Sequence, residues 1–195
     1  VEQKGEVTWI RLNRPDRMNA FDGDMNKTIR SAVQDAASSG VIVITGTGRA
    51  FCAGGYLAKL SEADPNDLRK MFYATLDLVE TIRTSPRPVI AAVNGAAIGG
   101  GNELVVACDI AVAAESATFG QTGVRVGSAP VLGGTNFLSM TIGEKRAKEV
   151  AFMCRRYKAA EAHELGWINA VVPDDQLEEE ASRWADELLC MSPRY

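Results

Sequence analysis

The sequence contains one histidine, His163, and its four cysteines are widely spaced, with no Cys-x-x-Cys pair. A histidine-rich metal site is therefore impossible, and a Ser-His-Asp triad is disfavoured because the histidine stands near the end of a charged helical segment. The cysteine spacing indicates reduced core thiols rather than a disulfide scaffold or a zinc site. We therefore expect no metal ion and a cytoplasmic location.

The sequence also lacks an excess of basic residues and any long apolar run. Its 195 residues include 21 lysines and arginines against 25 aspartates and glutamates, which gives a net charge of −4 and a pI near 5.2. This balance argues against nucleic-acid binding, which needs a basic face. No apolar run reaches the length of about 18 residues that a membrane span needs. The hydrophobic content of 46% excludes disorder as the main state.

Short apolar runs alternate with helical patterns along the chain. The β-branched runs 41–45 and 89–93 are typical of buried parallel strands. A helix that begins at Asp64-Pro65 and ends before Pro86 carries one apolar stripe. Further strands are expected at 6–12 and 109–113 and in a segment ending at 172; further helices at 25–36, 102–108, 145–154, 159–165 and 177–188. This order predicts one α/β domain over residues 1–195, with a parallel sheet and crossover helices.

Two glycine-rich segments each follow a buried strand, at 50–55 (Ala-Phe-Cys-Ala-Gly-Gly) and 97–101 (Ala-Ile-Gly-Gly-Gly). Ligands gather beyond the carboxyl ends of strands in α/β sheets, and glycine lets the backbone approach them closely. Two such loops, if they converge, would form an oxyanion hole for acyl-transfer or enolate chemistry. The alternative is that the glycines only make tight turns. Neither segment has a Walker A or GxGxxG pattern, which disfavours a nucleotide site.

Glu103 follows Gly100 by three residues and lies in the first turn of the next expected helix, beside Leu104, Val105 and Val106. Apolar surroundings raise the pKa of a carboxyl group, which a general acid or base requires. The alternative is a glutamate that complements the positive end of the helix dipole. The residues alone leave both interpretations open.

Motifs spread over nearly the whole chain, and in the same order, resemble the crotonase superfamily (the enoyl-CoA hydratase/isomerase family). Together they are far more specific than any one of them. In chain order they are Asn13-Arg14-Pro15 with Asn19-Ala20, Phe51-Cys52-Ala53-Gly54-Gly55, Pro88 to Gly95, Gly99 to Leu104, Cys108-Asp109, Phe119-Gly120-Gln121, and Ala162 to Pro173.

The resemblance implies an α/β fold in which ββα units form a spiral, rather than an open doubly wound sheet. Family chains typically continue for several helices beyond the point where this sequence stops, so the C-terminal helices are expected to be only partly present. Family members usually assemble as homotrimers or dimers of trimers. The implied ligand is an acyl-CoA thioester, in which coenzyme A is part of the substrate, and no permanently bound cofactor is expected.

The resemblance also implies roles for particular residues. The oxyanion-hole N–H groups fall at Gly55 and Gly100, where they would hold the thioester carbonyl as it becomes enolate-like. Glu103 falls on the first catalytic glutamate of the hydratases, and Arg17 is the expected source of positive charge for the anionic coenzyme A. The other positions implied to contact the acyl group or the CoA arm are Asn19, Ala20, Ala53, Gly54, Tyr56, Leu57, Ile98, Gly99, Thr122, Gly123 and Ser128.

Two positions depart from the hydratase pattern. Gly123 stands where hydratases carry a second glutamate, and Tyr56 stands where an aspartate is common. A hydratase uses two carboxylates to orient water, whereas one carboxylate can shuttle a proton for double-bond isomerisation. The segment 119–128 also resembles naphthoate synthases and alicyclic ketoacyl-CoA hydrolases, in which glycine likewise replaces the second glutamate.

Three interpretations of function follow. The first is an acyl-CoA enzyme of the enoyl-CoA hydratase/isomerase type. The second is ring opening or ring closure on a cyclic ketoacyl-CoA; the residues at 128–130 resemble the hydrolases, whereas naphthoate synthases usually lack a glutamate at the Glu103 position. The third belongs to another class, a non-catalytic member that binds coenzyme A or another protein.

Overall fold

The computed structural model describes residues 1–56, 63–130 and 132–192. Its larger sheet has six strands, and all neighbours are parallel except the first pair, in which β1 runs antiparallel to β2. In spatial order these strands are β1 (Glu2–Lys4), β2 (Val7–Leu12), β3 (Val41–Gly46), β5 (Val89–Val93), β7 (Ile110–Ala114) and β10 (Ala170–Val172).

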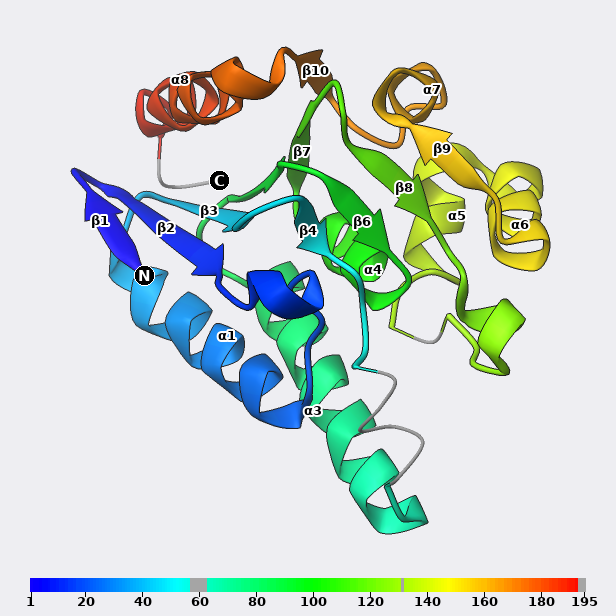
Figure 1. The fold of residues 1–195 in the computed structure, drawn as a ribbon. Coiled ribbons are helices and arrows are strands. Elements are labelled where there is room, and N and C mark those ends of the chain that lie inside the picture. The colour runs from blue at the N-terminus through cyan, green and yellow to red at the C-terminus, as the bar shows by residue number, and fades with distance from the viewer. Residues whose placement is uncertain (57–62, 131, 193–195) are drawn as a thin grey trace.

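The two faces of this sheet pack against different helices (Figure 1). Along β3, Val41 and Val43 face α8 (Leu177–Leu189), whereas Ile42 and Ile44 face the core shared with α1 (Gly23–Asp35) and α3 (Pro65–Arg83). A strand with both faces covered needs apolar residues at every position, and this explains why the run 41–45 shows no polar alternation.

A smaller four-stranded sheet lies beside the first. Its strands, in spatial order, are β4 (Ala50–Cys52), β6 (Ala96–Ile98), β8 (Thr118–Gly120) and β9 (Arg156–Lys158), of which β9 runs antiparallel. The chain therefore enters the large sheet and then the small one in each unit, as β3-β4-α3 and β5-β6-α4. This is the expected spiral of ββα units, and it corrects the single crossover sheet that periodicity alone predicts.

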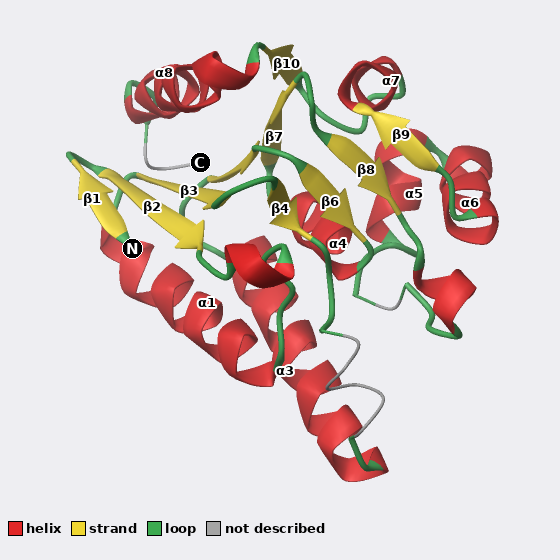
Figure 2. Cartoon of the chain, viewed as in Figure 1, coloured by secondary structure: helices red, strands yellow, loops and turns green. Residues whose placement is uncertain are grey.

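The remaining helices are short (Figure 2). The predicted helices at 102–108, 145–154 and 159–165 are confirmed as α4 (Gly100–Ala107), α6 (Glu144–Met153) and α7 (Ala159–Glu164). The sequence analysis missed α5 (Phe137–Ile142), because its six residues follow a long glycine-rich loop. The described ranges also contain four 3-10 helices: η1 (Pro15–Arg17), η2 (Ala36–Ser38), η3 (Gly123–Val126) and η4 (Asp174–Gln176).

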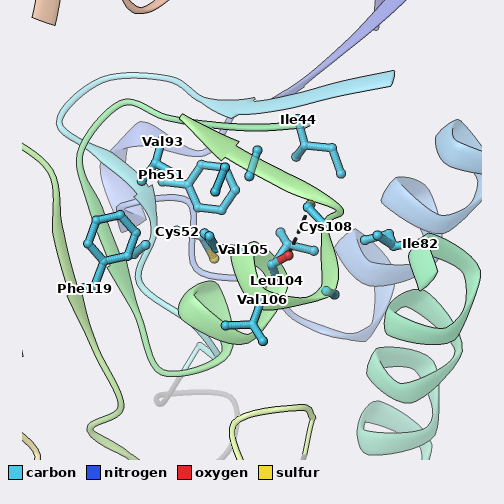
Figure 3. Close-up of a cluster of buried hydrophobic side chains, with 14 of the residues drawn as sticks. Ile44, Phe51, Cys52, Ile82, Val93, Leu104, Val105, Val106, Cys108 and Phe119 are labelled. Atoms are coloured by element: carbon cyan, nitrogen blue, oxygen red, sulfur yellow. Dashed lines mark hydrogen bonds between the residues drawn. The ribbon is translucent and has the colours of Figure 1, made fainter. Parts of the chain in front are cut away.

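Helix α4 lies in the centre of the molecule, where every residue from Gly101 to Ala107 is buried. Leu104 and Val105 join Phe51 and Cys52 of β4 in the principal hydrophobic cluster (Figure 3). An eight-residue helix with no solvated face cannot be found from amphipathic periodicity, but its packing holds Glu103 in a fixed place. No helix in the described part of the chain is long and apolar enough to cross a membrane.

Candidate active site

The two glycine-rich loops meet, which the sequence left open. They follow β4 and β6, the paired parallel strands of the small sheet, rather than the long strands β3 and β5. Gly54 adopts a φ of +87°, and a Cβ placed on it would lie 2.8 Å from the Ile98 carbonyl oxygen and 2.9 Å from the Gly100 nitrogen. Any side chain at position 54 would therefore push the loops apart.

Two backbone N–H groups are available where the loops meet. Gly100 is the first residue of α4, so its N–H has no acceptor within the helix. Around Gly55, the Phe21 N–H donates to the Gly54 carbonyl and the Tyr56 N–H donates to the Phe21 carbonyl. Among the residues described, no acceptor is found for the N–H of Gly55. Both groups can therefore donate to a ligand oxygen.

Glu103 lies one turn into α4 and is only 4% exposed. Its Oε1 accepts hydrogen bonds from the backbone N–H groups of Leu132, at 2.8 Å, and Gly134, at 3.0 Å. Burial raises the pKa of the Glu103 carboxyl to about 6, although these N–H groups and the side chain of Gln121 favour the charged form. A carboxyl with this pKa can take up and return a proton near neutral pH.

These groups share one cavity of about 140 Å³. Its walls come from the two glycine loops, the first turn of α4, the middle of α3 and the segment 121–132. The cavity includes nine of the site residues expected from the sequence: Ala53, Gly54, Gly55, Gly99, Gly100, Glu103, Thr122, Gly123 and Ser128.

A second cavity, of about 320 Å³, shares Ala53 and Gly55 with the first. Four more of the expected residues line it, namely Arg17, Ala20, Tyr56 and Ile98. The guanidinium of Arg17 lies 4.7 Å from the centre of the Tyr56 ring, so Tyr56 supports this cation where the family pattern has an aspartate. Arg156 of β9 adds a second positive charge to the wall.

Two expected site residues are not in these walls. Asn19 is fully buried, and its side chain accepts from the Arg14 N–H and donates to the carbonyls of Thr47 and Ala50. It therefore holds the segment that carries Arg17 against β4, without facing either cavity. Leu57 lies outside the described residues.

The sequence analysis missed several residues of the site. Gln121 was noted only as part of the Phe-Gly-Gln motif, and nothing in the sequence marks the N–H groups of Leu132 and Gly134 as partners of Glu103. The missed apolar or small lining residues are Phe21, Met71, Phe72, Thr75, Val126, Ala129, Pro130 and Leu132.

The titratable residues do not form a metal centre. In the ranges 1–56, 63–130 and 132–192, no three histidine, cysteine, aspartate or glutamate side chains are grouped to hold an ion. His163 is exposed in the last turn of α7, as predicted. Cys52, Cys108 and Cys154 are buried free thiols, and Cys190 is an exposed free thiol.

A spiral of ββα units is the fold of the crotonase superfamily. The enoyl-CoA hydratase/isomerase family model matches residues 2–195. The chain belongs to this family of enzymes.

Solved structures agree with this assignment. An enoyl-CoA hydratase subunit I from Geobacillus kaustophilus is 40% identical, with a TM-score of 0.92 over 98% of this chain and 75% of that one. An enoyl-CoA hydratase from Bacillus anthracis is 36% identical, with a TM-score of 0.93 over 96% of this chain and 74% of that one. The DspI protein of Pseudomonas aeruginosa is 30% identical, with a TM-score of 0.94 over 98% of this chain and 74% of that one.

Proposed function

We propose that this protein acts on an acyl-CoA thioester through a thioester enolate. The N–H groups of Gly55 and Gly100 bind the thioester oxygen as it gains negative charge, and Glu103 transfers the proton. The observation that carries the proposal is the placement of all three residues on one cavity, with the Glu103 pKa raised to about 6. Two preorganised donors in a site with little water stabilise an enolate far better than water does.

The first candidate reaction is double-bond isomerisation. The Glu103 carboxylate removes a proton from C2 of a 3-enoyl-CoA, and the C–H electron pair moves into a dienolate whose oxygen the two N–H groups hold. The protonated Glu103 then returns its proton to C4, which leaves the double bond between C2 and C3. The step needs one carboxyl group and no other reactant, so atoms and charge balance.

Gly123 supports one-carboxylate chemistry. A Cβ placed on it would lie 2.9 Å from the Ser128 carbonyl oxygen, and the Ser128 N–H already donates to the Gly123 carbonyl at 2.9 Å. The loop thus closes on position 123 and leaves no room for a side chain without a backbone shift. Water addition with two glutamates, the usual hydratase scheme, is therefore the less favoured member of this reaction class.

The same feature favours a second candidate, chemistry on a cyclic ketoacyl-CoA. In ring-opening hydrolysis, water adds to the ketone carbon and the carbon–carbon bond to C2 breaks. Glu103 as the carboxylate takes the proton that the water loses, the electron pair of the broken bond forms the thioester enolate, and Glu103 then gives this proton to C2. The product is heavier than the substrate by one water. Ring closure would use the same enolate as the nucleophile.

The second cavity extends the proposal to the CoA arm. Arg17 and Arg156 supply positive charge there, while the chain as a whole carries a net charge of −4. Local positive charge is needed to hold the phosphates of coenzyme A. We extend the proposal to a homotrimer or dimer of trimers in the cytoplasm. A non-catalytic member that only binds coenzyme A remains the candidate of another class.

Product analysis separates these candidates. The purified protein is incubated separately with crotonyl-CoA, a 3-enoyl-CoA and a cyclic 2-ketoacyl-CoA, and the products are identified by chromatography and mass spectrometry. Conversion of the 3-enoyl-CoA to an isomer of equal mass supports the first candidate. A gain of one water on the cyclic ketoester alone supports the second, and tight CoA binding without turnover supports the non-catalytic one.

Glu103→Gln tests the proton-transfer role. Loss of the carboxyl is expected to lower kcat on the active substrate by about 100- to 10,000-fold, the usual contribution of a positioned acid or base. Glu179→Gln, on an exposed face of α8, is the matched control and should keep the parent rate. Undiminished turnover in the Glu103 variant would remove this residue from the mechanism.

A further inference from the structure

The segment 14–21 joins β2 to α1 and lies beside the loop that carries Gly55 (Figure 1). Phe21 and Gly55 form a parallel bridge. Its two hydrogen bonds are made by the neighbours of Gly55: the Phe21 N–H donates to the Gly54 carbonyl, and the Tyr56 N–H donates to the Phe21 carbonyl, both at 2.9 Å. In this pattern the N–H of Gly55 itself points away from Phe21. The segment 14–21 therefore sets the direction of that N–H group.

The same segment also touches the second backbone donor. A Cβ placed on Gly100 would lie 2.5 Å from Cζ of the Phe21 ring, so the ring packs directly against the backbone of Gly100. Phe21 is only 3% exposed and has little freedom to move. Through its backbone at Gly55 and its ring at Gly100, this one residue contacts both positions whose N–H groups face the cavity.

Asn19 pins this segment to the small sheet. The side chain is 0% exposed, and its Nδ2 donates to the carbonyls of Thr47, at 2.9 Å, and Ala50, at 2.8 Å. Its Oδ1 accepts from the Arg14 N–H at 2.9 Å, while the Asn19 N–H donates to the Arg14 carbonyl, also at 2.9 Å. Because the amide nitrogen faces two carbonyls and the amide oxygen faces an N–H, only one orientation of the amide satisfies these bonds.

The backbone of Asn19 continues this connection to the loop. Asn19 has a φ of +56° and follows Met18, whose φ is +49°, so two successive residues adopt the left-handed conformation that asparagine tolerates better than most. The Asn19 carbonyl accepts from the Cys52 thiol at 3.2 Å, and Sγ of Cys52 accepts from the Gly54 N–H at 3.3 Å. Hydrogen bonds thus run without a gap from the Asn19 side chain to the residue before Gly55.

We propose that Asn19 is a positioning residue for the oxyanion hole: it pins the segment 14–21 to β4, and this segment sets the places of the N–H groups of Gly55 and Gly100. The proposal rests on the oxyanion role proposed for these two groups. Asn19 faces neither cavity, so it acts through the backbone and not by touching the substrate. Preorganised donors stabilise an enolate only where they are held in place, and a shift of about 1 Å costs about 100-fold in rate.

The test measures how strongly the site polarises a thioester carbonyl. Butyryl-CoA with ¹³C at the thioester carbon is bound to the protein at saturation, and isotope-edited infrared spectroscopy reads the carbonyl stretch. Two donated hydrogen bonds should lower this stretch in the parent relative to free butyryl-CoA. Asn19→Gly permits the left-handed conformation but removes the side-chain bonds, and it should lose about half of the shift or more. On the substrate found by product analysis, its kcat should fall about 100-fold.

Asn94→Gly is the matched control. The Asn94 side chain also makes three hydrogen bonds: it accepts from the Gly46 N–H at 2.9 Å and donates to the carbonyls of Gly48, at 2.9 Å, and Ala50, at 3.3 Å. It therefore shares the Ala50 carbonyl with Asn19, but these three bonds do not hold the segment 14–21. The control should lower the free energy of unfolding and keep the parent carbonyl stretch and kcat.

The proposal is overturned if folded Asn19→Gly keeps the parent carbonyl stretch, or if Asn94→Gly loses the shift equally. Asn19→Asp keeps an acceptor for the Arg14 N–H but loses the donors to the two carbonyls, and it gives the same reading if the glycine variant does not fold. A parent that does not bind butyryl-CoA, or leaves its carbonyl stretch unchanged, would end the oxyanion role itself. A parent shift that persists in the Asn19 variants would end only the positioning role.

Discussion

The two sheets of this molecule have different structural roles. The six-stranded sheet contains strands of five and six residues, such as β3 and β5, that are apolar on both faces and fully buried. The four strands of the smaller sheet are three residues each, and β6 is flanked by a glycine at both ends. The large sheet is covered by helices on both faces, whereas the small sheet supplies the backbone positions from which the two site loops leave.

The two sheets differ in how closely the backbone of a helix approaches the backbone of a strand. In the large sheet, branched side chains fill the space between sheet and helix, so losing an atom leaves a small cavity. On the side of the small sheet, the backbones of β4 and α4 are in direct contact, so an added atom would overlap backbone atoms. Three variants test this contrast, from the largest expected effect to the smallest.

Gly101→Ala adds one methyl group on the small-sheet side. The new Cβ would overlap the carbonyl oxygen of Cys52, which is backbone and cannot rotate away. We expect a loss of about 3 kcal/mol in the free energy of unfolding, the upper end for overpacking, together with reduced turnover as α4 shifts. Urea unfolding of the parent and the variant measures the loss in the free energy of unfolding. A loss below about 1 kcal/mol would mean that the backbone contact between β4 and α4 adjusts at little cost. That result would contradict the proposed difference between the two sheets.

Glu103 makes the site region pH-sensitive in a way that the large sheet is not. Its folded pKa, about 6, lies above the ordinary value of 4.5, so its contribution to stability is present below pH 4.5 and lost as the pH rises through 6. The loss is about 2 kcal/mol. The difference in unfolding free energy between the parent and Glu103→Gln should therefore change by about 2 kcal/mol from pH 4.5 to pH 7.5. Parallel profiles for the two proteins would contradict the raised pKa.

Ile44→Val removes one methyl group on the large-sheet side. Ile44 is 0% exposed on the face shared with α1 and α3. The variant should lose about 1 kcal/mol of stability, the usual cost of this truncation, and keep the parent kcat. Chemical unfolding and steady-state kinetics check both. A changed kcat would show that the large sheet also sets the geometry of the site.

The strands of the large sheet could be predicted from the sequence better than those of the small sheet, for a physical reason. The run 41–45 is recognisable because a buried parallel strand needs branched apolar residues at every position, and it is confirmed as β3. β4 and β6 escape detection because three residues show no periodicity. Their glycines indicated a loop site or tight turns, but not the strands that place these loops.

The long-range partners of Glu103 were also beyond the sequence. Leu132 and Gly134 reach its carboxylate through backbone N–H groups, which every non-proline residue has, so no residue type marks them. The residues alone left a raised pKa and a helix-dipole role open for Glu103, and the burial of its carboxyl in the structure raises the pKa. The family motifs pointed to Gly55 and Gly100, and a Cβ on Gly100 would meet the ring of Phe21 at 2.5 Å.

The contact between Gly123 and the Ser128 carbonyl has a consequence for how this protein can diverge. Glycine and glutamate are neighbours in the genetic code, so a second glutamate at the position suggested by the family resemblance looks like a short mutational path. The loop closes that path, since a side chain at 123 meets backbone before it reaches the cavity. A lineage with this loop would have to remodel residues 123–128 first, and a directed-evolution library should randomise that whole segment together.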